Sequence, residues 1–132
     1  MTEHPTKPTV ARVSFTLQVG EWDPGRVTQL LGVPPTRMHK KGEGKLGTST
    51  PSPWGVWQLL VENGDVEASA KRLLELLAGK RDAIAEVVRE MGAVASVRIW
   101  WEPEGGYGGY TLSSATVRGL AELGERVDFS FV

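Results

Sequence analysis

The stretch VARVSFTLQVG, residues 10–20, alternates between apolar and polar side chains. Apolar residues occupy every second position from Val13 to Val19, whereas the positions between them, from Arg12 to Gln18, are polar. A period of two with a single apolar face is typical of a strand that is buried on one side only. We therefore expect a sheet that carries its helices on one face and leaves the other face open.

Further strands and helices follow this stretch in a regular order. Helix starts are indicated by Asp23–Pro24, Asp65 and Ser113 or Ser114, since these residue types cap or open helices. Glycines that end or interrupt helices follow each start; they are Gly32, Gly79, Gly92 and Gly124. The expected strands are 13–19, 55–61, 95–101 and 126–131, with a brief strand near 37–41 and another beginning at GGYTL, 108–112.

The order of these elements is β-α-β-β-α-β followed by β-α-β. It predicts an α+β fold, with a ferredoxin-like split β-α-β arrangement extended by a C-terminal β-α-β unit. The sheet should be rich in antiparallel pairs, with its helices on one face. We expect residues 1–10 to be a flexible lead-in and residues 11–132 to form a single domain.

Composition narrows the class of protein. The 132 residues carry a formal net charge of −1 and no cysteine, which disfavours nucleic-acid binding by the molecule as a whole and excludes disulfides and thiolate ligands. No apolar run reaches the roughly 20 residues that a membrane-spanning helix needs. The polar start MTEHPTKPTV is unlike a signal peptide. We expect a cytoplasmic protein that does not enter membranes.

Several segments in order resemble a bacterial family of unknown function, the family numbered 4279. They are WDPGRVTQLLGVPPTRMHKKGE, WGVWQLLVEN, LLELLAGKRDAIAEVV and GGYTLSSATVRGLAELGERVDFSFV. Arg37, Lys41, Gly42 and Trp57 match the most specific positions of the pattern. The resemblance implies a small α+β domain of the bacterial cytoplasm, and it brings no activity, substrate or catalytic residue.

The glycine-rich stretch EPEGGYGGYTL, residues 102–112, suggests a phosphate-binding loop only at first sight. Its glycines lead into a predicted strand, whereas a dinucleotide-binding loop must open a helix. A tight turn at 105–109 explains the glycines without a ligand. In GEGKLGT, residues 42–48, Lys45 stands too early for a nucleotide-binding P-loop. No cofactor is therefore expected.

No catalytic or metal-binding constellation emerges from the residue types. The two histidines, His4 and His39, lack a partner at metal-ligand spacing. Glu102 and Glu104 would share one side of an extended segment, and such a pair is more often a solvated turn than an acid–base pair. The sequence favours a non-enzymatic role and leaves catalysis open.

The candidate binding residues belong to two groups. Arg37, His39 and Lys41 alternate along one segment and would point the same way if that segment is extended. Arg98 and Trp100 share the polar face of the 95–101 strand, opposite Trp101. These two groups predict an interaction surface for a protein partner, for instance an immunity-type target or a second copy of the chain.

The alternative is a pocket for a small anion, in a sensor or an enzyme. It would lie between Arg37, Lys41, Trp57 and the 102–110 turn. Nucleic acid is the third and least favoured ligand.

Overall fold

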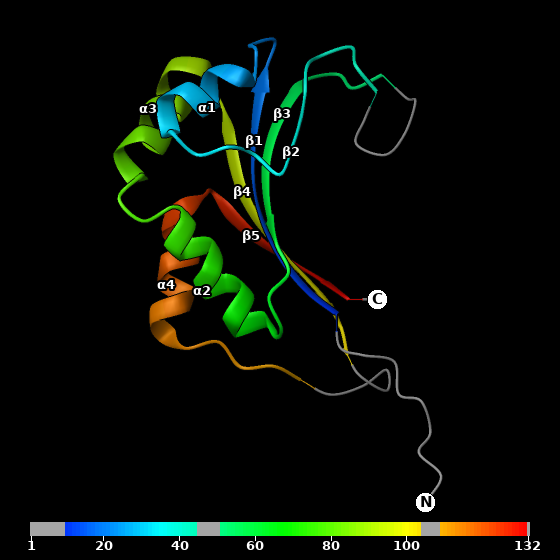
Figure 1. The fold of residues 1–132 in the computed structure, drawn as a ribbon, viewed down its shortest axis with the longest axis vertical. Coiled ribbons are helices and arrows are strands. Elements are labelled where there is room, and N and C mark those ends of the chain that lie inside the picture. Colours follow the sequence, from blue (N-terminus) through cyan, green and yellow to red (C-terminus); the bar gives the residue numbers. More distant parts are fainter. Residues whose placement is uncertain (1–9, 45–50, 104–108, 132) are drawn as a thin grey trace, which may run out of the picture.

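A computed structural model of the chain describes residues 10–44, 51–103 and 109–131. These residues form a five-stranded sheet in the order β2-β3-β1-β4-β5. Figure 1 shows the helices gathered on a single face of this sheet. The α+β class, predicted from the order of the elements, and the one-sided covering, predicted from the alternation at 10–20, are confirmed.

The sheet is built around β1 (Val10–Gly20), which lies between β3 (Gly55–Val61) and β4 (Val94–Glu102) and is antiparallel to both. The apolar side chains of β1 are fully buried on the helix side, because this face packs against the helices. Its alternate residues, from Arg12 to Gln18, lie on the opposite face. We call that opposite face of the sheet the open face.

The two edges of the sheet are β2 and β5. β2 (Arg37–His39) pairs antiparallel with β3, and β5 (Arg126–Phe131) pairs parallel with β4. Since β3 lies between β1 and β2, the β1-α1-β2 unit is split by an inserted strand, as expected. The ferredoxin-like name stays a prediction, because two helices rather than one connect β3 to β4 and a fifth strand extends the sheet.

The helices begin and end at the residues that the sequence indicates. Asp65 accepts a hydrogen bond from the Ala68 amide at 2.7 Å, and Gly32 and Gly92 end their helices with left-handed φ values of 70° and 59°. In Figure 1, α1 and α3 lie over one end of the sheet and α2 and α4 over the other. The helices are α1 (Gly25–Leu31), α2 (Val66–Leu76), α3 (Arg81–Met91) and α4 (Ser114–Leu123).

The core fills the space between the helices and the sheet. Leu73, Leu77 and Ile84 are buried there, as their helical spacing predicts. Phe129 alternates with Val127 along β5, and this alternation predicts that it points inward, yet it is 54% exposed. It lies on the helix side, as the register partner of Ile99, but β5 is an edge strand and leaves the outer side of this ring uncovered.

The predicted strand at GGYTL is wrong for the part that the structure describes, because residues 109–113 adopt no regular secondary structure. The chain must leave the end of β4 and reach the helix layer before α4 begins. Tyr110 packs edge-on against Trp101 with ring centroids 5.0 Å apart, and the Ser113 amide donates to the Glu67 carboxylate of α2. These contacts hold the segment against the helix-side face of β4 and beside α2, where it does not pair as a strand. The turn predicted at 105–109 lies mostly outside the described residues.

Candidate functional site

The strand registers bring four predicted binding residues, from separate strands, onto the open face. They are Arg37, His39, Arg98 and Trp100, which are paired with Gln58, Val56, Ser14 and Arg12. Each partner belongs to the face that the helices do not cover. The two groups of residues that the sequence singled out therefore lie on one continuous surface.

Trp57 lies on the other side of the sheet. It pairs in register with Leu17 and is 0% exposed. Its indole Nε1 donates a hydrogen bond to the Thr28 hydroxyl at 3.0 Å, and its ring packs edge-on against Phe15. Trp57 is thus a core residue. Arg37 and Trp57 lie on opposite faces of the sheet, so they do not line one pocket together. Most of the 102–110 turn, which was expected to complete that pocket with Lys41, lies outside the described residues.

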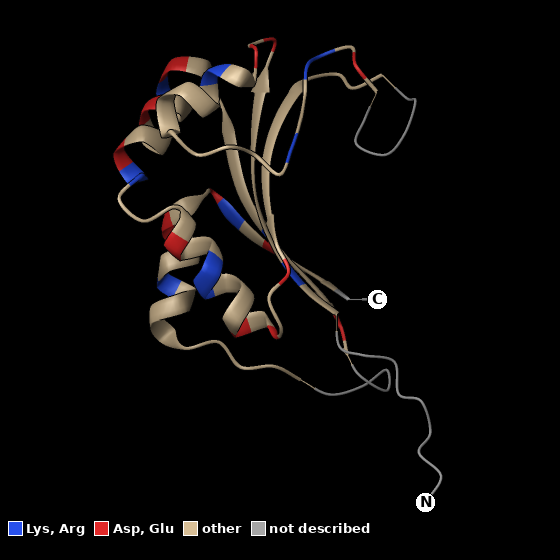
Figure 2. Cartoon of the chain, viewed as in Figure 1, with Lys and Arg blue, Asp and Glu red and all other residues tan. Residues whose placement is uncertain are grey.

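Lys41 lies beyond the end of β2, so the alternation of that strand does not reach it. Its Nζ donates to Glu21 Oε1 at 2.5 Å, and neighbouring Lys40 lies 3.5 Å from Asp23. Figure 2 shows this basic segment close to the acidic turn after β1. The hydrogen bond and charge of Lys41 hold the pKa of Glu21 below its usual value. The basic run is therefore partly neutralised by the protein itself.

His39 is buried, at 7% exposure, and its ring has one satisfied nitrogen. Its Nε2 lies 2.9 Å from the Ser52 hydroxyl, which in turn donates to the Trp54 carbonyl at 2.7 Å. Because the single Ser52 proton points to that carbonyl, Nε2 is the donor to Ser52. Nδ1 is buried and has no hydrogen-bond partner among the described residues.

A hollow of about 540 Å³ lies on the open face beside His39. Ser52 is fixed there by the base of the loop, since its amide donates to the Glu43 carbonyl and its carbonyl accepts from the Gly42 amide. These bonds hold the end of the loop over the corner of the sheet between β2 and β3. The hollow is lined by Gln18, His39, Ser52, Pro53, Trp54, Val56 and Arg98.

Two arginines of the open face have no ion pair. Arg12 pairs with Glu62 at 3.1 Å, and Arg126 with Asp128 at the same distance. For Arg37 and Arg98, the described part of the chain shows no carboxylate within ion-pair distance. Arg98 stands beside Asp128 in the β4–β5 register, yet it lines the hollow while Asp128 pairs with Arg126. Both free guanidinium groups are exposed to solvent.

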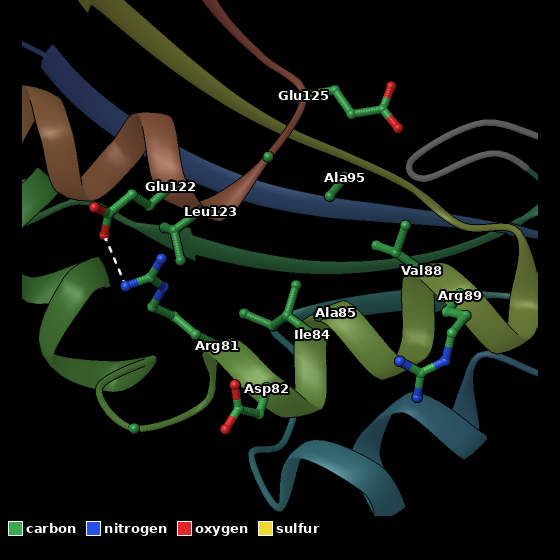
Figure 3. A pocket seen from close by; sticks show the side chains of 12 residues that line it. Arg81, Asp82, Ile84, Ala85, Val88, Arg89, Ala95, Glu122, Leu123 and Glu125 are labelled. Carbon is green, nitrogen blue, oxygen red and sulfur yellow. Dashed lines mark ion pairs between the residues drawn. The ribbon is translucent and has the colours of Figure 1, made fainter.

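A second hollow lies on the helix side, between α3 and the junction of α4 with β5. It has a volume of about 710 Å³ and an apolar floor that includes Ile84, Val88 and Leu123. Figure 3 shows Arg81 and Glu122 reaching toward each other across its rim, where their charged groups are 3.3 Å apart. These two charges neutralise each other. None of the residues that line this groove was predicted from the sequence as a binding residue.

Across residues 10–44, 51–103 and 109–131, no group of three or more His, Asp or Glu side chains is arranged to hold a metal ion. Within the same residues, no helix has the length and apolar character needed to cross a bilayer.

Comparison with known proteins decides the family. The pattern of a domain of unknown function, DUF4279, matches residues 8–131. The chain belongs to the DUF4279 family. Searches among curated proteins and among solved structures found no match. The DUF4279 description assigns no activity or ligand, so the function of this chain rests on the geometry of its own residues.

The structure adds two residues to the site that the sequence did not indicate, Ser52 and Trp54. Both follow a Pro-, Gly- and Ser-rich loop, and no local pattern links them to His39, which lies 13 positions earlier than Ser52. The signal that could have found them is the succession of two predicted strands, near 37–41 and at 55–61, which pair in the structure. A loop between two paired strands must return beside the residue at which it left, so its last residues lie close to His39.

Proposed function

We propose that this DUF4279 chain is a non-enzymatic binding module, and that its open face binds an acidic segment of a partner protein. One observation carries the proposal. Among the described residues, Arg37 and Arg98 have no ion pair; both lie on the face that no helix covers, and Arg98 lines a hollow there. Of the surface predicted from the sequence, the proposal keeps Arg37, His39, Arg98 and Trp100 and leaves out Lys41. It adds Gln18, Ser52 and Trp54, which line the hollow.

The charges of this face suit a carboxylate. A guanidinium group offers five N–H donors in a fixed plane and binds a carboxylate through two parallel hydrogen bonds. Arg98 lines the hollow together with Gln18, whose amide supplies a further donor. Other arginines of the face are already paired with Glu62 and Asp128. An incoming acidic side chain is therefore directed to Arg98 and Arg37.

Aromatic side chains flank these arginines. Trp54 lines the same hollow and is 43% exposed, and Trp100 lies half-buried two residues from Arg98 on the same face. Trp and Arg are enriched among the residues that contribute most to protein–protein binding. An indole covers apolar parts of a partner while its N–H can donate a hydrogen bond. A segment with both acidic and apolar side chains fits this surface.

The polar pair in the hollow favours binding over nucleophilic catalysis. A catalytic serine gives its proton to the histidine that activates it. Here the Ser52 hydroxyl gives its proton to the Trp54 carbonyl, and His39 Nε2–H donates to Ser52. The pair therefore holds the loop end in place. One partner with the required chemistry is a toxin with an acidic surface. This chain would then block the toxin in a bacterial cytoplasm, as an immunity protein does.

The proposal is tested by titrating isotope-labelled protein with two short peptides and following its amide resonances. One peptide alternates glutamate and phenylalanine, and the control alternates lysine and phenylalanine. We expect saturable shifts around Gln18, Gln58 and Arg98 with the first peptide only. Arg98→Gln should weaken binding about five- to tenfold. The matched control Arg72→Gln changes an exposed arginine of α2, which pairs with Glu75, and should leave binding unchanged.

Three results would contradict the proposal. They are an equal response to both peptides, shifts confined to the groove between α3 and α4, and unchanged affinity in Arg98→Gln. Titration with citrate or glutamate, at the same carboxylate concentration as the peptide, tests whether the site binds a small anion or a peptide segment. Tight binding of these small molecules would assign the site to a free anion instead.

A further inference from the structure

The two edge strands of the sheet, β2 and β5, differ in how easily they could pair with a strand of another chain. An uncovered edge strand presents backbone N–H and C=O groups that can pair with another chain, and proteins usually shorten or block such edges. β2 has three residues and follows Pro34 and Pro35, so little of that edge can pair. β5 has six residues, from Arg126 to Phe131, and none of them is a proline.

Apolar surface accompanies the unblocked edge. Phe129 is 54% exposed on the helix side of β5, and Val117 of α4, a helix that packs on β4 and β5, is 48% exposed. Each is among the most exposed large hydrophobic side chains of the described residues. An unblocked edge strand with an exposed apolar side chain on it and another on the helix beside it matches what β-sheet extension between chains requires.

We propose that β5 pairs antiparallel with β5 of a second copy of this chain, centred on Phe129. A two-fold axis normal to the sheet leaves the helix side of both copies on the same side. Residues opposite each other must then point to the same face, so the axis passes beside one residue, which pairs with its own copy. A centre at Asp128 would place two aspartates opposite each other, which is unfavourable. A centre at Val127 would pair only residues 126–128 within the strands, since β5 begins at Arg126.

A centre at Phe129 avoids the pair of opposed aspartates and also pairs most of the strand. It places the two Phe129 rings opposite each other on the helix side, an aromatic cross-strand pair. On the open face it places Asp128 opposite Ser130 of the second copy, and a serine hydroxyl can donate to a carboxylate. Pairing from 127 to 131 then uses nearly the whole strand.

The dimer has a consequence for the open face. The same axis leaves the open faces of both copies on one side of a continuous sheet of ten strands, twice the five of one chain. Arg98 and Trp100 of each copy then contribute to one extended surface. The dimer does not depend on what that surface binds, and its test is separate from that of the proposed function.

The chain has no cysteine, so single cysteines report the register by disulfide formation. Directly opposite residues of an antiparallel pair have Cα atoms about 4.5–5.5 Å apart, within the roughly 4.4–6.8 Å that a disulfide spans. We expect Phe129→Cys to cross-link under mild oxidation. Asp128→Cys, Val127→Cys and the control Met38→Cys, which changes a residue 43% exposed on β2, should form little disulfide-linked dimer. Efficient cross-linking of the Met38→Cys variant, or preferential linking at position 127 or 128, would overturn the proposed register.

Sedimentation of the unmodified chain supplies the second measurement. A dimer should form with a Kd below about 100 μM, and Phe129→Lys should weaken it at least tenfold without changing the thermal transition at low concentration. Arg98→Gln should leave the dimer intact, and Phe129→Lys should leave the peptide affinity per chain intact. A chain that stays monomeric at about 100 μM, or a dimer that tolerates Phe129→Lys, would overturn the inference.

Discussion

Trp57 of β3 donates its indole N–H to the hydroxyl of Thr28 in α1, with 3.0 Å between nitrogen and oxygen. Trp57 is fully buried, so this bond satisfies a polar group that water cannot reach. It also fixes α1, a helix of seven residues, to the sheet. The pair explains why a tryptophan that matches a specific family position belongs to the core and not to a binding surface.

Thr28→Val should destabilise the protein by about 1–3 kcal/mol, because the buried indole N–H loses its acceptor while the side-chain shape is kept. Thr28→Ser retains the hydroxyl and should cost less. Denaturant unfolding of the two variants makes the comparison. A loss in Thr28→Val that is smaller than the loss in Thr28→Ser would show that the hydrogen bond contributes less than the methyl group of Thr28.

Gly124 and Gly119 should respond differently to alanine. A Cβ at Gly124 would lie 2.8 Å from the Ala95 carbonyl oxygen, which belongs to the backbone of β4 and cannot move aside. A Cβ at Gly119 would also come within 2.8 Å of an atom, but that atom is the flexible end of Leu74. We expect Gly124→Ala to cost about 1–3 kcal/mol.

Gly119→Ala should be close to neutral, because a gain of about 1 kcal/mol in helix propensity offsets the shift of Leu74. Thermal unfolding of the two variants distinguishes them. If Gly119→Ala proves the more damaging change, α2 and α4 are packed more rigidly than their side chains indicate.

Glu67 should make the thermal stability of the protein depend on pH in the acidic range. Its carboxylate accepts hydrogen bonds from the Ser113 amide at 3.0 Å and the Thr116 hydroxyl at 3.2 Å, and these bonds lower its pKa from the usual 4.5. A carboxyl group whose pKa is lower in the folded than in the unfolded state stabilises the protein when the pH is above the unfolded-state pKa. This stabilisation is lost as the pH falls through the folded-state pKa. Glu67→Gln should therefore lower the melting temperature at pH 7.

The difference between Glu67→Gln and the unmodified protein should shrink as the pH falls below about 4.5. Glu75→Gln, on the same helix, is the control, since Glu75 makes only an exposed ion pair with Arg72. A difference for Glu67→Gln that stays constant from pH 7 to about pH 3 would show that the charge of Glu67 plays no part.

Trp100 and Trp101 should separate binding from stability. Trp101 is buried against the core and packs on Tyr110, so Trp101→Ala should cost about 3–5 kcal/mol. Trp100 lies half-buried on the open face, and Trp100→Ala should cost clearly less while weakening partner binding by more than about 1 kcal/mol. Thermal melts and the peptide titration measure the two effects. A silent Trp101→Ala beside an unfolded Trp100→Ala would reverse the two faces.

Local patterns predicted the elements of the fold because each depends on neighbours in the chain. The alternation from Arg12 to Val19 determined which face of β1 is buried, and Asp65, Gly32 and Gly92 determined helix ends through their own backbone and side-chain geometry. The same parity placed Arg98 and Trp100 on the open face. The prediction from local sequence was wrong at GGYTL. There the chain must connect β4 to α4, and this requirement overrides the strand preference of the residues.

Only the tertiary structure decided how those elements combine into a candidate site. The sequence determined the side of each strand on which a side chain points, since that follows from a period of two. It did not determine that Trp57 faces Thr28, that Lys41 is neutralised by Glu21, or that Ser52 meets His39. These contacts join segments far apart in the chain, and they form because the strand order and the return of a loop bring them together in space.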